Sequence, residues 1–310
     1  MGLTFFYDWE VDLMVWLQQT LGDFGAVVGK LFTMFGEQIV VVAILFFLYY
    51  CYDKLVAERI ILDLLAALNW CAGIKNLFYR RRPYFDHPQI ICIKAPEGGD
   101  IYDITLQGFS HPSMHSATAF CTYMSLAQWI KKKWAWIVAV ILTLGVGFSR
   151  FMLGVHYPTD VIAGYTVALF SIVIMNLLRK WIKKKWILFT VVILTCAPGL
   201  FYAVTADYYT CFGILVGFCL GILFENKYVN FKDRTDLFHS CIRYAGGIAV
   251  FLGVTNLLKL PFDSEFLAGG TKAALLVRCM RYFVATFLCI GPYTMLFDSI
   301  EKIGKKKENA

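Results

Sequence analysis

Charged residues are scarce in this chain of 310 residues. Asp, Glu, Lys and Arg together make up 16% of it, and hydrophobic residues make up 59%. Soluble globular domains carry about 25% charged residues. Because the shortage extends along the whole chain, the composition predicts a membrane protein and excludes a soluble domain with a single anchor. Met1–Met14 contain no basic residue, so no cleavable signal peptide is expected.

Paired cysteine spacings are also missing. The ten cysteines lie mostly inside apolar runs, as small buried hydrophobic residues do. We therefore expect no disulfide framework, no metal site and no cofactor. The net charge of +7 comes from basic residues at the ends of apolar runs, where such residues set membrane topology. A nucleic-acid partner is not expected.

Apolar runs of about 20 residues, the length that crosses a bilayer, dominate the rest of the sequence. Nine runs occur, at residues 37–53, 56–77, 112–130, 134–153, 156–178, 186–204, 207–224, 240–257 and 273–299. They predict an all-α fold, a polytopic transmembrane helical bundle of about nine spans. Residues 5–22 alternate apolar and acidic positions at helical spacing, which predicts a helix lying in the membrane interface. The expected parts are an N-terminal interfacial segment (1–36), a five-span catalytic core (37–178) and a four-span extension (179–310).

Basic clusters between the runs indicate the orientation. Lys131–Lys133, Lys183–Lys185 and Lys227 follow alternate runs and belong in the cytoplasm under the positive-inside rule. The N-terminus is then outside and the C-terminus cytoplasmic, in the plasma membrane of a bacterium or the endoplasmic reticulum of a eukaryote. Arg80–Arg82 break the rule at an outer span end, which favours an anionic ligand there. The loop 84–111 is too long for a plain connection and is expected to cap this outer face.

Three short motifs converge on that outer face. They are Lys75 with Arg82-Pro83, then Pro112-Ser113-Met114-His115, then Ser149-Arg150 followed by His156 and Asp160. Lys75, Arg82 and Arg150 offer cationic donors to phosphate oxygens. Pro112 is typical of a helix start, where free N–H groups bind anions, and Ser113 adds a hydroxyl donor. The motifs therefore predict a phosphate-binding site.

Two histidines and an aspartate add chemistry to this site. His156 and Asp160 are four residues apart and so share one face of a helix. The carboxylate can keep one ring nitrogen protonated and leave the other as a nucleophile toward phosphorus. His115 can protonate the leaving oxygen, and the basic donors can stabilise the charge on phosphorus without a metal.

The order and spacing of these motifs over residues 75–160 resemble the type-2 phosphatidic acid phosphatase superfamily. The resemblance implies that His156 becomes phosphorylated, with Asp160 as its partner and His115 as the acid. It also implies which residues hold the phosphate: Lys75, Arg82, Ser113, Met114 and Arg150. Met114 stands where the family usually has glycine, which lets the backbone approach a ligand closely. We expect this departure to change the shape of the pocket.

A site at the membrane interface favours a phosphorylated lipid as substrate, either polyprenyl diphosphate, phosphatidate or a sphingoid phosphate, with membrane lipids as the other partners. The superfamily includes glucose-6-phosphatase, so hydrolysis of a soluble sugar phosphate is the alternative. A transporter is more remote, because the last four runs hold few polar residues. For Arg80 and Arg81, a role in the site and a contact with lipid headgroups both stay open. His111 is a candidate for the rim, and His87 and His239 are expected at the surface.

Overall fold

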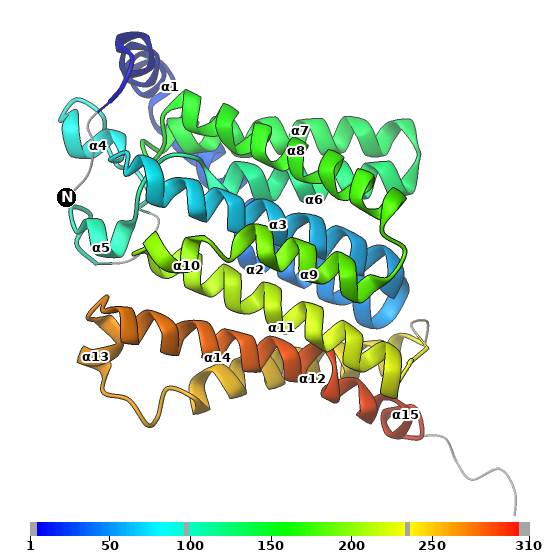
Figure 1. Ribbon diagram of the computed structural model, residues 1–310. Helices are drawn as coiled ribbons and strands as arrows, with labels where there is room; N and C mark the ends of the chain where they lie inside the picture. Colours follow the sequence, from blue (N-terminus) through cyan, green and yellow to red (C-terminus); the bar gives the residue numbers. More distant parts are fainter. Residues whose placement is uncertain (1–4, 96–98, 233–235, 304–310) are drawn as a thin grey trace, which may run out of the picture.

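The computed structural model describes residues 5–95, 99–232 and 236–303 of the chain, so part of the loop 84–111, residues 96–98, lies outside the described residues. The described residues form helices and no strand (Figure 1). The longer helices are α1 (Asp8–Met34), α2 (Gln38–Phe47), α3 (Lys54–Phe78), α6 (Met114–Ile130), α7 (Lys133–Met152), α8 (Pro158–Trp181), α9 (Lys185–Cys196), α11 (Ala206–Tyr228), α12 (Leu237–Leu257) and α14 (Lys272–Ile290). The short ones are η1 (Leu48–Tyr52), α4 (Pro83–Asp86), α5 (Ile104–Gln107), α10 (Gly199–Tyr202), α13 (Ser264–Ala268), η2 (Pro292–Leu296) and α15 (Phe297–Ile300).

The nine apolar runs are helical along most of their length, which confirms the all-α fold class. Two runs are interrupted at a proline, whose ring lacks the N–H that an α-helix needs and crowds the preceding turn. Pro198 stands between α9 and α10, and Pro292 follows the end of α14.

The structure has fewer helices with the length and composition of a membrane span than the sequence has apolar runs. Within the described residues, seven helical stretches are long and apolar enough to cross a membrane, and the first, Asp8–Tyr52, joins α1, α2 and η1. The expected spans α3 and α6 are not among the seven. α3 carries charged residues such as Lys54 and Asp63, and α6 has only 17 residues. A multi-pass helical bundle is therefore confirmed, and the count of about nine is not.

α3 is the central helix of the bundle. It packs against α6, α8 and α11, and every residue from Ile60 to Asn69 is buried. A helix that is buried all round belongs in the interior of a large bundle. Its last turn carries Lys75, so the packing of α3 fixes where that lysine lies.

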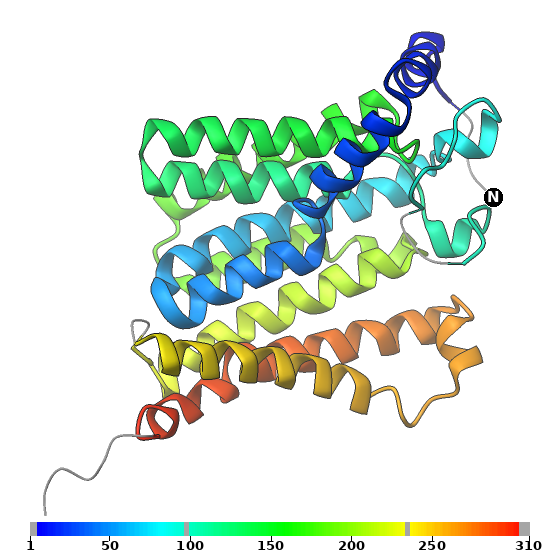
Figure 2. The same cartoon turned by 180° about the vertical axis from the view of Figure 1, so that it is seen from behind.

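The N-terminal helix extends beyond its expected end at residue 22 and reaches Met34. Gly22 kinks it, with φ of 44° and ψ of −132°, a conformation that favours glycine. Figures 1 and 2 show the part before the kink almost end-on, across the long helices, and Figure 2 shows the part after it crossing the bundle obliquely. α1 packs against α7. The first part has the orientation that an interfacial helix needs, and that role stays a prediction. The sequence pattern missed the second part, because its packing against α7 is a tertiary contact.

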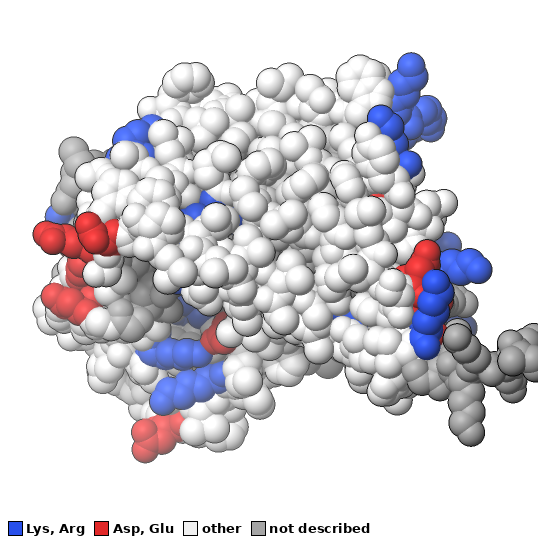
Figure 3. All heavy atoms as spheres, turned by 90° about the horizontal axis from the view of Figure 1, so that it is seen from below, with Lys and Arg blue, Asp and Glu red and all other residues white. Residues whose placement is uncertain are grey.

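The two ends of the bundle differ in their connections. The joins α6–α7, α8–α9 and α11–α12 lie at one end, and α4, α5, α10 and α13 lie at the other, which we call the loop end (Figure 1). On the face seen in Figure 3, charged side chains gather at the two ends, basic ones at both and acidic ones mainly at the loop end, with a largely uncharged surface between them. The uncharged surface fits a bundle that crosses a membrane, and the orientation with the loop end outside stays a prediction.

Two histidines expected at the surface are buried, so that expectation was wrong. His87 is 7% exposed and His239 is 5% exposed. The ring of His87 packs edge-on against Phe6, with the centroids 4.3 Å apart. His239 Nε2 lies 3.1 Å from the carbonyl oxygen of Ile303. Both burials depend on residues distant in the sequence.

Cysteine labelling tests the orientation. Asp100 lies in the loop 84–111 and Lys132 at the opposite end, and both are exposed. In a background with Cys92→Ser and Cys241→Ser, an impermeant maleimide added to intact cells should label Asp100→Cys, because basic clusters such as that at Lys132 stay inside. Lys132→Cys should react only after permeabilisation. The reverse pattern would place the loop end in the cytoplasm.

Candidate active site

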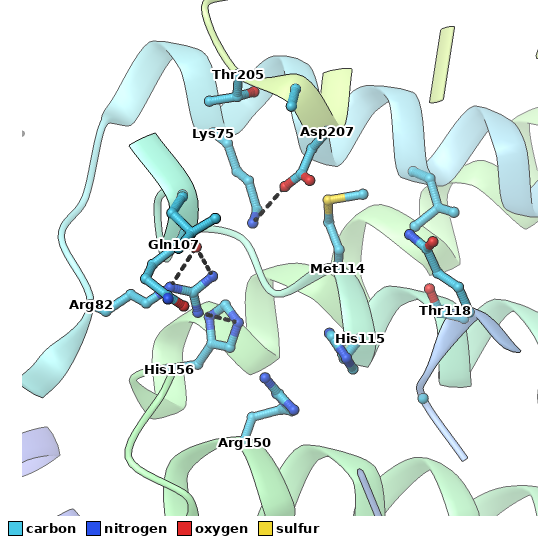
Figure 4. A pocket seen from close by; sticks show the side chains of 16 residues that line it. Lys75, Arg82, Gln107, Met114, His115, Thr118, Arg150, His156, Thr205 and Asp207 are labelled. Atoms are coloured by element: carbon cyan, nitrogen blue, oxygen red, sulfur yellow. Dashed lines mark hydrogen bonds and ion pairs between the residues drawn. The ribbon is translucent and has the colours of Figure 1, made fainter. Parts of the chain in front are cut away.

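A cavity of about 110 Å³ opens at the loop end of the bundle. Six of the eight predicted site residues line it: Lys75, Arg82, Met114, His115, Arg150 and His156. They come from the end of α3, the connection after it, the start of α6, the last turn of α7 and the turn between α7 and α8. Figure 4 shows the two histidines and the basic side chains turned toward one space. The structure therefore brings together motifs that are far apart in the sequence.

The ring of His156 has one nitrogen toward a carboxylate and one toward the cavity. Nδ1 is 3.6 Å from Oδ2 of Asp160 and 3.2 Å from Oγ of Ser110. Nε2 is 3.3 Å from Nη1 of Arg82. A carboxylate beside Nδ1 favours the tautomer with the proton on Nδ1, which leaves the lone pair of Nε2 facing the cavity. This is the orientation that a nucleophilic histidine needs.

Asp160 does not line the cavity but lies behind His156, fully buried at 0% exposure. It stands in the first turn of α8, where Oδ2 accepts the N–H of Tyr157 at 2.8 Å and the hydroxyl of Ser110. Oδ1 accepts from Nη1 of Arg80 at 2.7 Å and lies 3.1 Å from Nδ1 of His111. A buried carboxylate is tolerated when it is paired in this way.

Arg80 connects Asp160 to the N-terminal helix. Its Nη2 donates to Glu10 at 2.7 Å, its Nε donates to the carbonyl of Phe5 at 2.9 Å, and its guanidinium lies 4.0 Å from the ring centroid of Tyr157. Arg80 is 1% exposed and Glu10 is 0% exposed. The guanidinium is thus held by protein groups on several sides, so a contact with lipid headgroups is excluded and its role is to hold Asp160.

The other residues left open by the sequence have simpler surroundings. The side chain of Arg81 is 34% exposed and pairs with Asp86 at 3.3 Å. His111 is 18% exposed at its side chain and contacts Asp160 rather than the cavity lining. Neither residue faces the space where a ligand would bind.

Three buried cations surround the cavity; the two arginines contact no carboxylate among the described residues, and Lys75 lies 3.7 Å from Oδ2 of Asp207. Arg82 donates through Nε and Nη2 to the carbonyl of Gln107, at 3.0 and 2.6 Å. Arg150 donates to Oγ1 of Thr33 at 2.5 Å, and its buried Nε has no hydrogen-bond partner among the described residues. Lys75 donates to the carbonyl of Phe109 at 3.0 Å. Burial lowers the pKa of the Arg82 guanidinium below its ordinary value. An anion in the cavity would offset this cost.

Ser113 and Met114 are placed differently. Ser113 is 0% exposed, and its Oγ caps α6 by accepting the N–H of Ser116 at 3.4 Å. Ser113 does not line the cavity, so its expected contact with phosphate stays a prediction. The side chain of Met114 lines the cavity, where a glycine would leave open space.

The motifs missed several residues that the structure places at the site. Glu10, Ser110 and Asp207 contact site residues from the N-terminal helix, the loop and α11. Ser110 lies next to the second motif, which is a weak signal. Nothing in the spacing of Glu10 or Asp207 indicates the site, because they approach it only through the packing of helices.

Similarity to known proteins agrees with this geometry. Residues 56–186 match the family model of the PAP2 superfamily, and residues 209–306 match that of the PAP2 superfamily phosphatase, transmembrane extension. The chain belongs to the PAP2 superfamily. The two matched ranges together cover more than half of the chain, and the first contains all eight predicted site residues. The resemblance seen in the motifs is therefore confirmed.

Curated PAP2-like relatives match shorter parts of the chain. Phosphatidylglycerophosphatase B of Bacillus subtilis is 34% identical over 85 residues, which cover 24% of this chain and 42% of the relative. Lipid A 4'-phosphatase of Bacteroides thetaiotaomicron is 35% identical over 64 residues, 21% of this chain and 28% of the relative. Undecaprenyl-diphosphatase of Sulfolobus acidocaldarius is 39% identical over 57 residues, 18% and 27% respectively. The chain thus spans less than half the length of each of these relatives. No solved structure matches the chain.

Adjacent arginines test the buried connection to Glu10. Removing one partner of a buried ion pair costs about 3–5 kcal/mol, so Arg80→Ala should strongly lower the melting temperature of the purified protein. Arg81→Ala removes a half-exposed pair worth at most about 1 kcal/mol and should change it little. Thermal unfolding in one detergent compares the two variants. Equal melting temperatures would show that the Arg80 pairs do not stabilise the fold.

Proposed function

We propose that this chain is a membrane phosphatase that removes phosphate from a phosphorylated lipid through a phosphohistidine intermediate at His156. The proposal rests on what the two ring nitrogens of His156 face. Asp160 lies beside Nδ1, and Nε2 faces a cavity with three buried cations. A nucleophile with an orienting carboxylate on one side and phosphate-binding donors on the other is suited to phosphoryl transfer.

In the first step, the Nε2 lone pair of His156 attacks phosphorus and the bond from phosphorus to the lipid oxygen breaks. His115, which lines the same cavity, gives a proton to that leaving oxygen. Asp160 stabilises the positive charge that develops on the ring of His156. Lys75 and the two cavity arginines stabilise the negative charge on the phosphoryl oxygens.

In the second step, a water molecule replaces the lipid. Its oxygen attacks phosphorus, one of its protons passes to His115, and the nitrogen–phosphorus bond breaks. Inorganic phosphate leaves, His156 regains its lone pair, and His115 is again protonated for the next cycle. Every proton that His115 gives in the first step is thus returned in the second.

A lipid is the substrate class that the surroundings favour. The cavity lies at one end of the bundle, where an interface with a membrane surface would lie, and its lining includes the apolar side chains Leu68, Leu106 and Met114. The three curated relatives are named for the phosphatase reaction on phosphatidylglycerophosphate, lipid A or undecaprenyl diphosphate. We place the site on the outer face of the membrane. A soluble sugar phosphate is the competing substrate.

Phosphate release from a substrate panel tests the function. Purified protein should hydrolyse at least one of polyprenyl diphosphate, phosphatidate and sphingosine phosphate faster than glucose 6-phosphate. His156→Ala should abolish release, and His115→Ala should slow it by about 10²–10⁴-fold, the usual contribution of a general acid. His239→Gln, at the opposite end of the bundle, should keep the activity. Activity that survives His156→Ala, or a preference for the sugar phosphate, would contradict the mechanism or the lipid assignment respectively.

Met114 offers a second test, of pocket shape. Met114→Gly removes a side chain that lines the cavity, so kcat/KM should rise severalfold for larger headgroups, such as phosphatidylglycerophosphate, relative to phosphatidate. The loss of helix propensity is about 1 kcal/mol, so the protein should still fold. Met114→Leu keeps most of the volume and should keep the native ratio. An unchanged ratio in Met114→Gly would show that this position does not shape selectivity.

A further inference from the structure

A single acidic side chain occurs among the described residues that line the cavity, and it comes from outside the motifs. Asp207 lies in the first turn of α11, and its Oδ2 is 3.7 Å from Nζ of Lys75. Figure 4 shows these two side chains next to each other, on the side of the cavity away from Arg150. The Asp207 side chain is 48% exposed and that of Lys75 is 4% exposed. The carboxylate therefore stands at the mouth of the cavity and the ammonium group stands inside.

Asp207 is one of two described partners of the Lys75 ammonium group. Nζ of Lys75 donates to the carbonyl of Phe109 at 3.0 Å, a fixed backbone partner. Gly108, with φ of 67°, also lines the cavity, and a Cβ there would lie 3.9 Å from Oδ2 of Asp207. The carboxylate of Asp207 therefore borders the open space of the cavity and is not buried against other side chains. This position allows it to interact with a bound ligand.

The charge of the cavity depends on this carboxylate. Three cations, Lys75, Arg82 and Arg150, and one carboxylate give a net charge of +2. A phosphomonoester carries about 1.5 to 2 negative charges at neutral pH, so the cavity with Asp207 matches it. Without Asp207 the net charge would be +3, which would match the larger negative charge of a diphosphate better.

Geometry adds to this charge balance. The reacting phosphate must lie between the cations and Nε2 of His156, so the second phosphate of a diphosphate must lie farther out. The lining residues with the most exposed side chains are Gln38, Leu106 and Asp207. A second phosphate leaving the cavity on the Asp207 side would meet a like charge, and like charges a few ångströms apart repel strongly where water is partly excluded. An uncharged lipid oxygen and its glycerol or sphingoid chain would not.

We propose that Asp207 is a specificity-determining residue that favours phosphomonoesters over diphosphates of the same lipid. The inference rests on the proposed phosphatase function and names the substrate class within it. Asp207 lies two positions before the matched transmembrane extension at residues 209–306. The helix that carries it, α11, continues into that extension and packs on α14 and α3. The extension therefore helps to hold the carboxylate at the mouth of the cavity.

Two substrates with one tail test the proposal. We compare kcat/KM for farnesyl phosphate and farnesyl diphosphate, with phosphate release as the readout. The native protein should prefer the monophosphate. Asp207→Asn keeps the shape and removes the charge, so the ratio of diphosphate to monophosphate should rise about tenfold, as expected for removing a like charge at close range. Asp207→Glu should restore a ratio close to the native one.

Asp263→Asn is the matched control, because Asp263 is an exposed residue of the extension that does not line the cavity. In this variant the ratio of kcat/KM for the diphosphate to that for the monophosphate should stay within about twofold of the native value. A ratio unchanged in Asp207→Asn, with hydrolysis that still requires His156, overturns the role of Asp207 and leaves the phosphatase function standing. Hydrolysis of neither compound, nor of any other lipid phosphate in the panel, overturns both. Equal gains on both substrates also contradict the proposal, because they indicate a general effect on affinity.

Discussion

A single buried carboxylate holds the site together. Asp160 is inaccessible to solvent, and an unpaired charge in that position would be very costly. Its oxygens are satisfied by groups from separate segments, among them Ser110 from the loop and Arg80 from the connection after α3. Arg80 also pairs with a second carboxylate, that of Glu10 in α1. The neutralisation of one charge therefore draws three segments together, and the ring of His156 is oriented by the same carboxylate.

The sequence predicts which of the proposed site residues lie near one another where that nearness follows from local spacing or from the direction of the helices. His156 and Asp160 are four positions apart, a spacing that predicts one shared helix face. That prediction was wrong in its detail, because His156 lies in the turn just before α8, whose N-cap is Tyr157, and only Asp160 stands in the helix. The two side chains still meet, with Nδ1 3.6 Å from Oδ2. Spans that alternate in direction bring Lys75 and Arg150 to the same end of the bundle. The three neighbouring arginines are a different case. Arg80 is 1% exposed and the side chain of Arg81 is 34% exposed. The sequence does not predict this difference, because it arises from the pairing of Arg80 with Glu10 on a distant helix.

The ends and the bends of helices also combine features that the local sequence predicts with features that tertiary contacts decide. A side-chain oxygen at a helix N-cap can bind either the backbone N–H groups of its own helix or an incoming anion, and the two uses need the same residue. Ser113 is bound to its own helix, a choice that depends on its rotamer. The apolar runs likewise predict that helices exist, yet they do not predict the kink at Gly22, the packing of α1 against α7 or the merging of α1, α2 and η1 into one stretch. Periodicity describes which face is apolar and contains no information about such bends.

The kind of partner that each arginine has decides what it can do for a ligand. Arg80 is paired with two carboxylates, so its charge is used up inside the protein and none is left for an anion. Arg150 is held by the hydroxyl of Thr33, and Arg82 by backbone carbonyls, which fix the guanidinium groups without neutralising them. An arginine held by neutral partners thus keeps its positive charge available for an anionic ligand, whereas an arginine paired with carboxylates stabilises the fold. Because α1 supplies both Glu10 and Thr33, the N-terminal segment outside the matched range 56–186 helps to assign both roles.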